Sequence, residues 1–446
     1  MQATLDIEQV LGVRQLRWFD VSVLFWSFLA MVADGYDLAG LASAAPALAV
    51  AWHLPPKAFA PALSASLFGI LFGAPFLGNL GDRFGRKPVI IIGCAVYGLG
   101  TLATARATNL DEIVVLRFFT GLGLGGLMPN IVALNAELAP KRLRAVLIIL
   151  TFTGISMGAG LPGAVQAWLI PSYGWQIVFW IGGFVPLAVA CCLLFALPES
   201  PRYLARQPDR RAELLRTIRQ LRPGLAIADH TQVVTAPTRQ MFASTIRQLL
   251  GGSFVWLTPL VWACFAAALM ANFFLNSWLP LILHGNGMTA RQNGIATLCY
   301  HYAGMAGGLL VSVVLGRFGF ALIALLFLFG ALGTAAIGIP GLSYTGLVAT
   351  VMLSGFGIIG AQFCNTATSG LIYPTEFRSS GVGWALGVGR FGSILGPLVG
   401  GLLIGRVTLQ HLFLLGAAPM IAGLFASLWL AQLTYRQTCT TRILVS

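Results

Sequence analysis

Five ionisable residues lie within, or at the inner ends of, apolar stretches long enough to cross a membrane: Asp34, Asp37, Arg117, Glu137 and Arg390. An ionised side chain at the centre of a bilayer costs about 3 kcal/mol on insertion scales. A chain that keeps several such residues must offset this cost through pairing, hydration or function. We therefore take these five residues as the first hypothesis for a functional site.

The two aspartates are spaced for proton chemistry. Asp34 lies about 15 residues beyond Phe19, which is roughly 22 Å into the first apolar stretch of a helix. Asp37 follows at i+3 and shares its helix face. Two carboxylates this close in a low dielectric do not both ionise easily, which favours proton uptake near neutral pH. We predict proton coupling through Asp34, Asp37 and Glu137; the alternative is that one aspartate simply pairs with an arginine of a neighbouring helix.

The two arginines are candidate partners for carboxylates. Arg117 opens the segment RFFTGLGLGG, in which Gly121 and Gly125 are spaced for close helix contact. It could pair with either aspartate or meet the carboxylate of a ligand. Arg390, in GVGRFGSILGP, is the other basic residue well inside an apolar stretch and belongs to the other half of the chain. We expect it to be the better carboxylate anchor if the site lies between the halves. The alternative for each is a structural arginine that reaches the membrane surface.

The segment GNLGDRFGRKP at 78–88 has the composition of a gate, with one acid among three bases in a tight turn. Asp82 could interact with a helix N-terminus, while Arg83 and Arg86 could meet carboxylates or helix C-termini. Contacts of this kind, made in one conformation and broken in another, would form a latch. The matching loop in the second half, GRFG at 316–319, lacks the acid, so we expect the latch on one side only.

Weaker candidates lie in the second half of the chain. His301, between two tyrosines, could hydrogen-bond to or stack on a ring, although a histidine satisfied by helix packing is the more common situation. Further groups that could line a polar cavity are Asn272, Asn276, Trp278, Gln362 and Asn365.

The elements that must position these residues are membrane helices. Of the 446 residues, 57% are hydrophobic and only 9% charged, whereas soluble chains carry about 25% charged residues. At roughly 20 residues per span, the chain has room for about twelve. We predict an all-α membrane protein with an N-terminal six-helix bundle (1–197), a polar linker loop (198–252) and a C-terminal six-helix bundle (253–446). The predicted spans are 20–48, 58–80, 88–106, 110–136, 144–169, 175–197, 253–283, 291–315, 318–339, 343–371, 381–405 and 409–433.

The basic residues predict the orientation of these spans. With the N-terminus placed in the cytoplasm, 21 of the 27 basic residues fall on the cytoplasmic side, four on the opposite side and two within spans. Because Lys and Arg are retained on the cytoplasmic side, we expect both termini and the central loop to lie there.

An internal repeat supports the division into two halves. Pro140, Arg144 and Gly158 recur as Pro374, Arg378 and Gly392, each displaced by 234 positions. This is typical of transporters built from two parallel repeats, whose binding site lies between the halves near the middle of the membrane.

Composition also excludes several classes of protein. The net charge of +13 is spread over many short loops without interleaved aromatic residues, which argues against nucleic-acid binding. The seven cysteines lie mostly in apolar runs without metal-ligand spacing. No GxxxxGK[ST] phosphate-binding loop is present. We therefore expect neither an ATP-driven pump nor an enzyme, and no cofactor or metal.

These motifs together resemble the major facilitator superfamily. GNLGDRFGRKP is similar to its signature between helices 2 and 3, RFFTGLGLGG to its fourth-helix signature, and PESPRYL at 198–204 to the run after the sixth helix. DGYD at 34–37 resembles the DGxD motif of the aromatic acid/proton symporter family. The resemblance implies transport roles for Asp34, Asp37, Asp82, Arg117, Glu137, Arg378 and Arg390. It departs at the degenerate loop 316–319 and at Asn79-Leu80-Gly81, where Ala-Asp is more usual.

The function implied is import of a small aromatic carboxylate, such as benzoate, a hydroxybenzoate or a phenylpropanoate, together with protons. The expected partners are that substrate, protons and the lipid bilayer of the inner membrane, and we expect a monomer. Two alternatives stay open on these residues: efflux by proton exchange, and a membrane sensor that binds such acids without carrying them.

Overall fold

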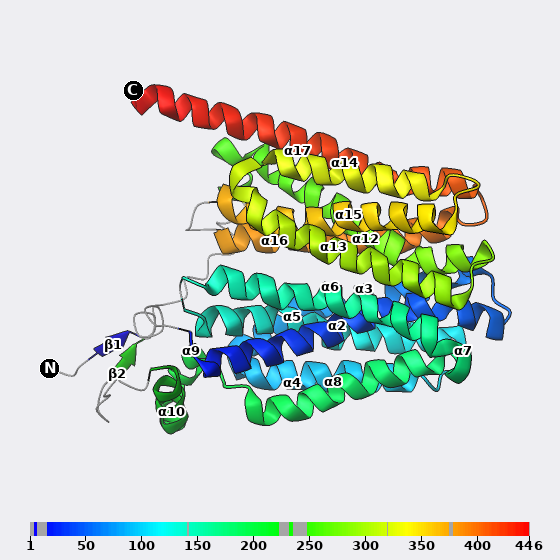
Figure 1. The fold of residues 1–446 in the computed structure, drawn as a ribbon. Coiled ribbons are helices and arrows are strands. Elements are labelled where there is room, and N and C mark those ends of the chain that lie inside the picture. Colours follow the sequence, from blue (N-terminus) through cyan, green and yellow to red (C-terminus); the bar gives the residue numbers. More distant parts are fainter. Residues whose placement is uncertain are drawn as a thin grey trace. The chain divides into compact units, whose positions relative to one another are not determined.

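The computed structural model describes residues 4–6, 16–140, 142–222, 232–234, 248–318, 320–373 and 378–445, and this part of the chain is almost entirely helical. Each of the twelve predicted spans falls mainly on a different helix of 18 residues or more (Figure 1). These helices are α2 (Trp18–Ala51), α3 (Ala60–Phe84), α4 (Arg86–Thr104), α5 (Leu110–Leu138), α6 (Arg144–Trp168), α8 (Gln176–Ala196), α12 (Leu257–Gly285), α13 (Ala290–Phe318), α14 (Phe320–Ile337), α15 (Tyr344–Ile372), α16 (Arg378–Leu403) and α17 (Leu409–Val445).

Ten of these helices are long and apolar enough to cross a membrane within the described ranges. The other two are α14, whose apolar part Ala321–Ile337 is short, and α5, which carries Asp111, Glu112, Arg117 and Glu137. The structure therefore confirms a helical chain in which, among the described residues, ten helices have the length and composition to cross a membrane. The count of twelve spans stays a prediction for α5 and α14.

The predicted linker loop 198–252 contains regular structure. The short elements of the described chain are α7 (Ile170–Tyr173), α9 (Pro201–Leu204), α10 (Arg211–Leu221), three 3-10 turns, η1 (Pro56–Phe59), η2 (Pro208–Arg210) and η3 (Gly252–Phe254), and the parallel strands β1 (Thr4–Asp6) and β2 (Gln232–Val234). Helix α10 buries Leu214, Leu215, Ile218 and Leu221 on one face. Its apolar residues recur with helical spacing among arginines, so a search for long apolar runs misses it.

Contacts between Cα atoms divide the chain into two compact units. Unit 1 comprises Met1–Leu38, Phe68–Ala159 and Phe179–Arg239, and unit 2 comprises Ala39–Leu67, Gly160–Val178 and Gln240–Ser446. Within unit 2, α13 packs on α15, α12 on α16, and α14 on both α15 and α17 (Figure 1). The boundaries cut through four long helices, and the division into two six-helix bundles stays a prediction.

Glycines bring the helices of unit 1 into close contact. A Cβ added to Gly125 of α5 would lie 2.6 Å from the backbone nitrogen of Ala74 in α3, and one added to Gly69 of α3 would lie 2.8 Å from Cα of Gly121. Both distances are too short for real carbon atoms. The predicted close contact through Gly121 and Gly125 is therefore confirmed, and α3 is the partner.

The internal repeat also has a structural counterpart. Helices α6 and α16 begin at the repeated arginines. Gly158 of α6 lies against the backbone carbonyl of Val32 in α2, and Gly392 of α16 against that of Ala266 in α12. Val32 and Ala266 are themselves 234 positions apart. The same helix contact therefore occurs twice, once in each half of the sequence.

Candidate functional site

Arg117 and Asp37 form a buried ion pair in unit 1. Arg117 Nη1 donates to Asp37 Oδ1 at 3.1 Å, and Nη2 donates to the backbone oxygen of Asp37 at 3.1 Å and to Oδ2 of its carboxylate. The Thr101 hydroxyl donates to Asp37 Oδ1 at 2.6 Å. Helices α5, α2 and α4 supply one residue each. Arg117 and Asp37 are each 2% exposed, so water contributes little to their solvation.

Low exposure makes each charge dependent on the other. Removing one partner of a buried ion pair costs about 3–5 kcal/mol, because the remaining charge is left uncompensated in a poorly solvated place. The two-pronged contact between the guanidinium and the carboxylate also fixes the direction of both side chains. Of the partners that the sequence allowed for Arg117, the structure brings Asp37 to it.

The other residues of the DGYD segment also lie at contacts between helices. A Cβ on Gly35 would lie 2.8 Å from the backbone carbonyl carbon of Ile155, so α2 and α6 meet where no side chain fits. Tyr36 packs against Gly182 of α8. Asp34 is buried and lies near enough to Cys94 and Tyr97 of α4 to interact with them electrostatically.

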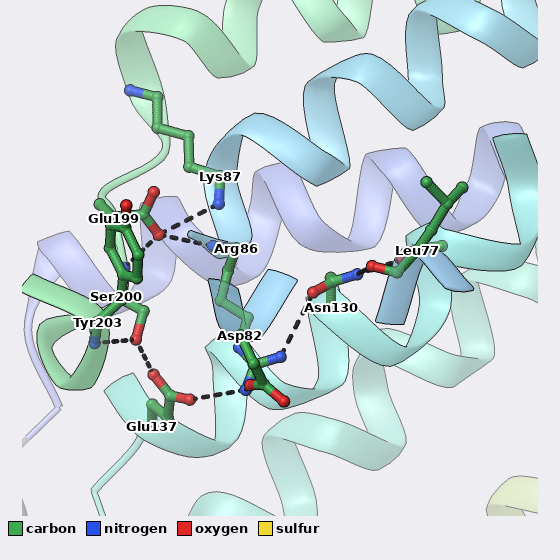
Figure 2. Close-up of polar contacts among 10 residues, drawn as sticks. Leu77, Asp82, Arg86, Lys87, Asn130, Glu137, Glu199, Ser200 and Tyr203 are labelled. Carbon is green, nitrogen blue, oxygen red and sulfur yellow. Dashed lines mark hydrogen bonds and ion pairs between the residues drawn. The ribbon is translucent and has the colours of Figure 1, made fainter. Parts of the chain in front are cut away.

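A second polar cluster joins the α3–α4 turn to the end of α5 (Figure 2). Arg86 Nη2 lies 2.6 Å from Asp82 Oδ1 and 3.4 Å from Glu137 Oε1. Its Nη1 donates to Asn130 Oδ1 at 3.4 Å. Asp82 is mostly exposed, whereas Glu137 is buried. Arg86 therefore reaches from a surface carboxylate to a buried one.

Glu199, in the segment after α8, caps α4 from outside that helix. Its Oε1 accepts hydrogen bonds from the backbone N–H groups of Arg86 at 2.8 Å, Lys87 at 3.2 Å and Ser200 at 2.7 Å. The residue at the N-cap of α4 is Gly85, which has no side chain to serve those donors. Burial raises the pKa of the Glu199 carboxyl, and the three backbone hydrogen bonds oppose that rise.

Ser200 links this cap to the end of α5. Its Oγ accepts from the backbone N–H of Tyr203 at 3.1 Å, so it is the N-cap of α9, and it donates to Glu137 Oε2 (Figure 2). Sequence reasoning named neither Glu199 nor Ser200 as a site residue. A serine followed by proline is the start signal of a helix, and it could have marked Ser200 as a cap.

The predicted proton-coupling residues do not lie together. Glu137 and Arg117 are 20 residues apart on the same helix, which is about 30 Å along its axis. Asp37 lies at the Arg117 end. Glu137 therefore belongs to the cluster around Arg86, with the residues predicted to form a gate. Arg83, also predicted for the gate, is exposed, and its guanidinium stacks over Phe84 at 5.4 Å from the ring centre.

Polar pairs connect α12 to α13 in unit 2. The Tyr300 hydroxyl donates to Asn272 Oδ1 at 2.9 Å. One turn along, His301 Nε2 and Asn276 Oδ1 are 3.2 Å apart. Trp278 is fully buried, and its ring N–H donates to the backbone oxygen of Pro397 at 3.0 Å. The Trp278 ring is therefore occupied by packing and by this hydrogen bond.

Three other residues that the sequence predicts for the binding site lie elsewhere in unit 2. Arg390 is half-buried on α16, and its backbone oxygen accepts from Ser393 Oγ at 2.6 Å. Gln362 donates to the Ala268 carbonyl at 3.4 Å. The buried Asn365 Nδ2 has no partner among the described residues.

Part of the predicted gate lies outside the described structure. Arg378 begins α16, but its side chain lies outside the description, as do those of the loop 316–319. The one-sidedness of the latch therefore stays a prediction.

The sequence is similar to those of known membrane transporters. The family model described as Major Facilitator Superfamily matches residues 27–372. The chain is 35% identical over 430 residues to the gallate transporter of Pseudomonas putida, covering 96% of this chain and 95% of that one. It is 35% identical over 407 residues to the 4-hydroxybenzoate transporter PcaK of Pseudomonas aeruginosa, covering 90% of each.

The fold has a counterpart among solved structures. The partially occluded inward-open form of the xylose transporter XylE from E. coli matches it with a TM-score of 0.72 at 15% identity, covering 93% of this chain and 98% of that one. The chain therefore belongs to the major facilitator superfamily, and within it to the aromatic acid/proton symporter family.

Proposed function

We propose that this protein imports small aromatic carboxylates together with protons, by alternating access. The observation that carries the proposal is the buried pair of Asp37 and Arg117, in a chain whose full-length relatives are named for gallate and 4-hydroxybenzoate. We place the protein in the inner membrane, with both termini and residues 198–252 in the cytoplasm, on the distribution of its basic residues.

In this proposal, the ion pair links the uptake of a proton to a change of conformation. A proton that arrives at Asp37 removes the negative charge that Arg117 depends on. The cost of a buried, uncompensated guanidinium then favours a rearrangement of α2 against α5. Protonation and conformational change are thereby coupled through one contact. Asp34, one turn away and also buried, is the second proposed proton acceptor.

We assign the substrate carboxylate to Arg390. It is half-buried on α16, and a guanidinium can hold a carboxylate by two parallel hydrogen bonds. Arg117 already uses its fork on Asp37. The amide and imidazole groups of Asn272, Asn276 and His301 are the proposed contacts for the substrate ring and its hydroxyl groups.

We assign the cluster around Arg86 to gating. Its contacts join the α3–α4 turn, the end of α5 and the start of α9 through charge-assisted hydrogen bonds. Such contacts stabilise the conformation that contains them. The step that separates these helices must break them, so the cluster influences how long each conformation lasts.

Uptake by purified protein in liposomes tests the proposal. The panel is gallate, 4-hydroxybenzoate, benzoate and 3-(3-hydroxyphenyl)propionate, with xylose as a neutral control. One proton per monovalent acid moves no net charge, so each unit of pH difference should give about tenfold accumulation. We expect aromatic acids to accumulate on the alkaline side and xylose to equilibrate at most. Accumulation that requires sodium, or that proceeds against the imposed proton gradient, contradicts symport, and binding without uptake indicates a sensor.

A further inference from the structure

Two adjoining hollows lie on the surface of unit 1, where the start of α2 meets α10. The first, about 630 Å³, is lined by Leu16, Arg17, Trp18, Phe19, Val21 and Gln220. The second, about 500 Å³, is lined by Ala212, Leu215, Arg216, Arg219 and Gln220. Both include Gln220, so they adjoin at that residue. We call them together the α2–α10 groove.

Among the described residues, the charged ones that line the groove are all basic. Arg216 and Arg219 lie exposed on the polar face of α10, and no ion pair holds either guanidinium in the described chain. Arg17 adds a third positive charge at the other end. Two nearby acids of the described chain have other partners: Glu213 pairs with Arg210 at 2.7 Å, and the buried Asp20 accepts from the backbone N–H of Arg17 at 2.9 Å. The lining therefore favours an anion.

The other side of the groove is apolar and exposed. Trp18 is 87% exposed, and Leu16 and Val21 are 44% and 38% exposed. A free inorganic anion would leave this surface in water. A ligand with an anionic group and an adjoining apolar part matches both sides of the groove at once.

The position of Trp18 indicates the source of such a ligand. Trp18 is the first residue of α2, which is long and apolar enough to cross a membrane from that point. Tryptophans at the ends of membrane helices lie at the level of the lipid head groups. The groove therefore opens at the depth where phospholipid phosphates lie, and basic residues near that surface attract anionic lipids.

We propose that the α2–α10 groove binds one anionic phospholipid. Arg216 and Arg219 contact its phosphate, Arg17 adds to the positive field, and Leu16, Trp18 and Val21 contact its apolar part. The lipid would join the linker helix α10 to the membrane beside the first span. The proposal does not depend on what the protein transports.

Lipid retention by the full-length protein tests this. The protein is reconstituted into vesicles of phosphatidylethanolamine and phosphatidylglycerol, extracted in mild detergent, and analysed by mass spectrometry for bound phosphatidylglycerol. We expect the wild type to retain it and Arg216→Gln/Arg219→Gln to lose it at least about tenfold, because each basic residue contributes several-fold to binding an anionic surface. The matched control is Arg142→Gln/Arg291→Gln, which removes the same charge from exposed arginines outside the groove and should retain the lipid.

Two further measurements distinguish a phospholipid from a free inorganic anion as the ligand of the groove. Trp18→Ala leaves the charge unchanged and should lower retention several-fold if the apolar side contributes. Inorganic phosphate at millimolar concentration should not displace the lipid. Equal retention by both double variants, or equal loss in both, overturns the proposal, since it leaves only the general excess of positive charge. Displacement by phosphate together with no effect of Trp18→Ala overturns it in favour of a site for free anions. Thermal melting of every variant confirms folding.

Discussion

The contribution of Asp37 and Arg117 to the stability of the folded protein depends on both residues being present. Asp37→Asn leaves the Arg117 guanidinium buried without its charge partner, and Arg117→Gln leaves the carboxylate in the same position. Each single variant should lose about 3–5 kcal/mol of stability. The double variant Asp37→Asn/Arg117→Gln should recover part of that loss, because no lone charge remains. Thermal melting of purified protein measures this; a double variant that loses the sum of the two singles contradicts the coupling.

Transport by the Asp37 variants separates the proton from the substrate. Because the proposed carboxylate anchor is on α16, Asp37→Asn should still bind an aromatic acid in equilibrium dialysis while losing gradient-driven accumulation.

Arg390 offers a test in which the ligand, rather than the protein, supplies the control. If its guanidinium holds the substrate carboxylate, Arg390→Ala should weaken binding of an aromatic acid about tenfold or more and that of its neutral amide far less. Arg390→Lys keeps the charge but lacks the fork, so it should give an intermediate result. Calorimetry with acid and amide on each variant decides the matter, with thermal melting to check folding. Equal losses for acid and amide remove Arg390 from the site and leave Arg117 as the candidate.

Glu199 should make stability depend on pH. Burial raises its pKa in the folded protein above the ordinary value of 4.5, so the folded state holds this proton more tightly than the unfolded state does. The associated stability is fully present below about pH 4.5 and is lost as pH rises through the folded pKa. Glu199→Gln keeps an oxygen acceptor and cannot titrate. The melting temperature of the wild type relative to this variant should therefore fall as pH rises from 4.5 to 7.5. A difference that grows with pH contradicts this account, and Asp209→Asn, an exposed acid nearby, should track the wild type.

At the scale of elements, the contact between α6 and α13 in unit 2 depends on two glycines. A Cβ on Gly163 would lie 2.6 Å from the Gly294 carbonyl oxygen and 3.0 Å from the Leu298 nitrogen. Gly163→Ala should therefore push the helices apart and cost about 1–3 kcal/mol. Gly383 of α16 has nothing within 4 Å of its added Cβ, so Gly383→Ala is the matched control and should be neutral or slightly stabilising. Thermal melting compares the two, and equal effects contradict the packing argument.

The sequence predicts elements better than it predicts which elements meet. Long apolar runs locate all twelve long helices of the described chain, because the composition of each run is enough to show that it avoids water. Glu137 is an example: its contacts with Arg86 and Ser200, which come from segments far away in sequence, are not visible in the apolar run that contains it, and its role in proton coupling stays a prediction. Glu199 was missed for the same reason, since its three backbone donors are visible only once α4 has been placed beside it.

At the scale of the whole molecule, the asymmetry of basic residues predicts one topology. A cysteine introduced at Asp209, after α9, should be protected in intact cells from a membrane-impermeant maleimide. A cysteine introduced at Asn286, just after α12, should be labelled. Both positions are exposed, and a background without the native cysteines removes other targets. Labelling of the first position without disruption of the membrane overturns the orientation.

In the proposed mechanism, the Asp37–Arg117 pair also has a consequence for how the membrane voltage acts on transport. Moving one elementary charge through the full field takes about 2.3 kcal/mol per 100 mV. A guanidinium and a carboxylate that move together carry no net charge, so shifting this pair does no electrical work. In the proposed cycle, the proton at Asp37 adds one positive charge to the protein, and the monovalent acid at Arg390 adds one negative charge, so the two together add none. Voltage should therefore bias the protonated, unloaded form most strongly, and it should leave the loaded form nearly insensitive to the electrical part of the driving force.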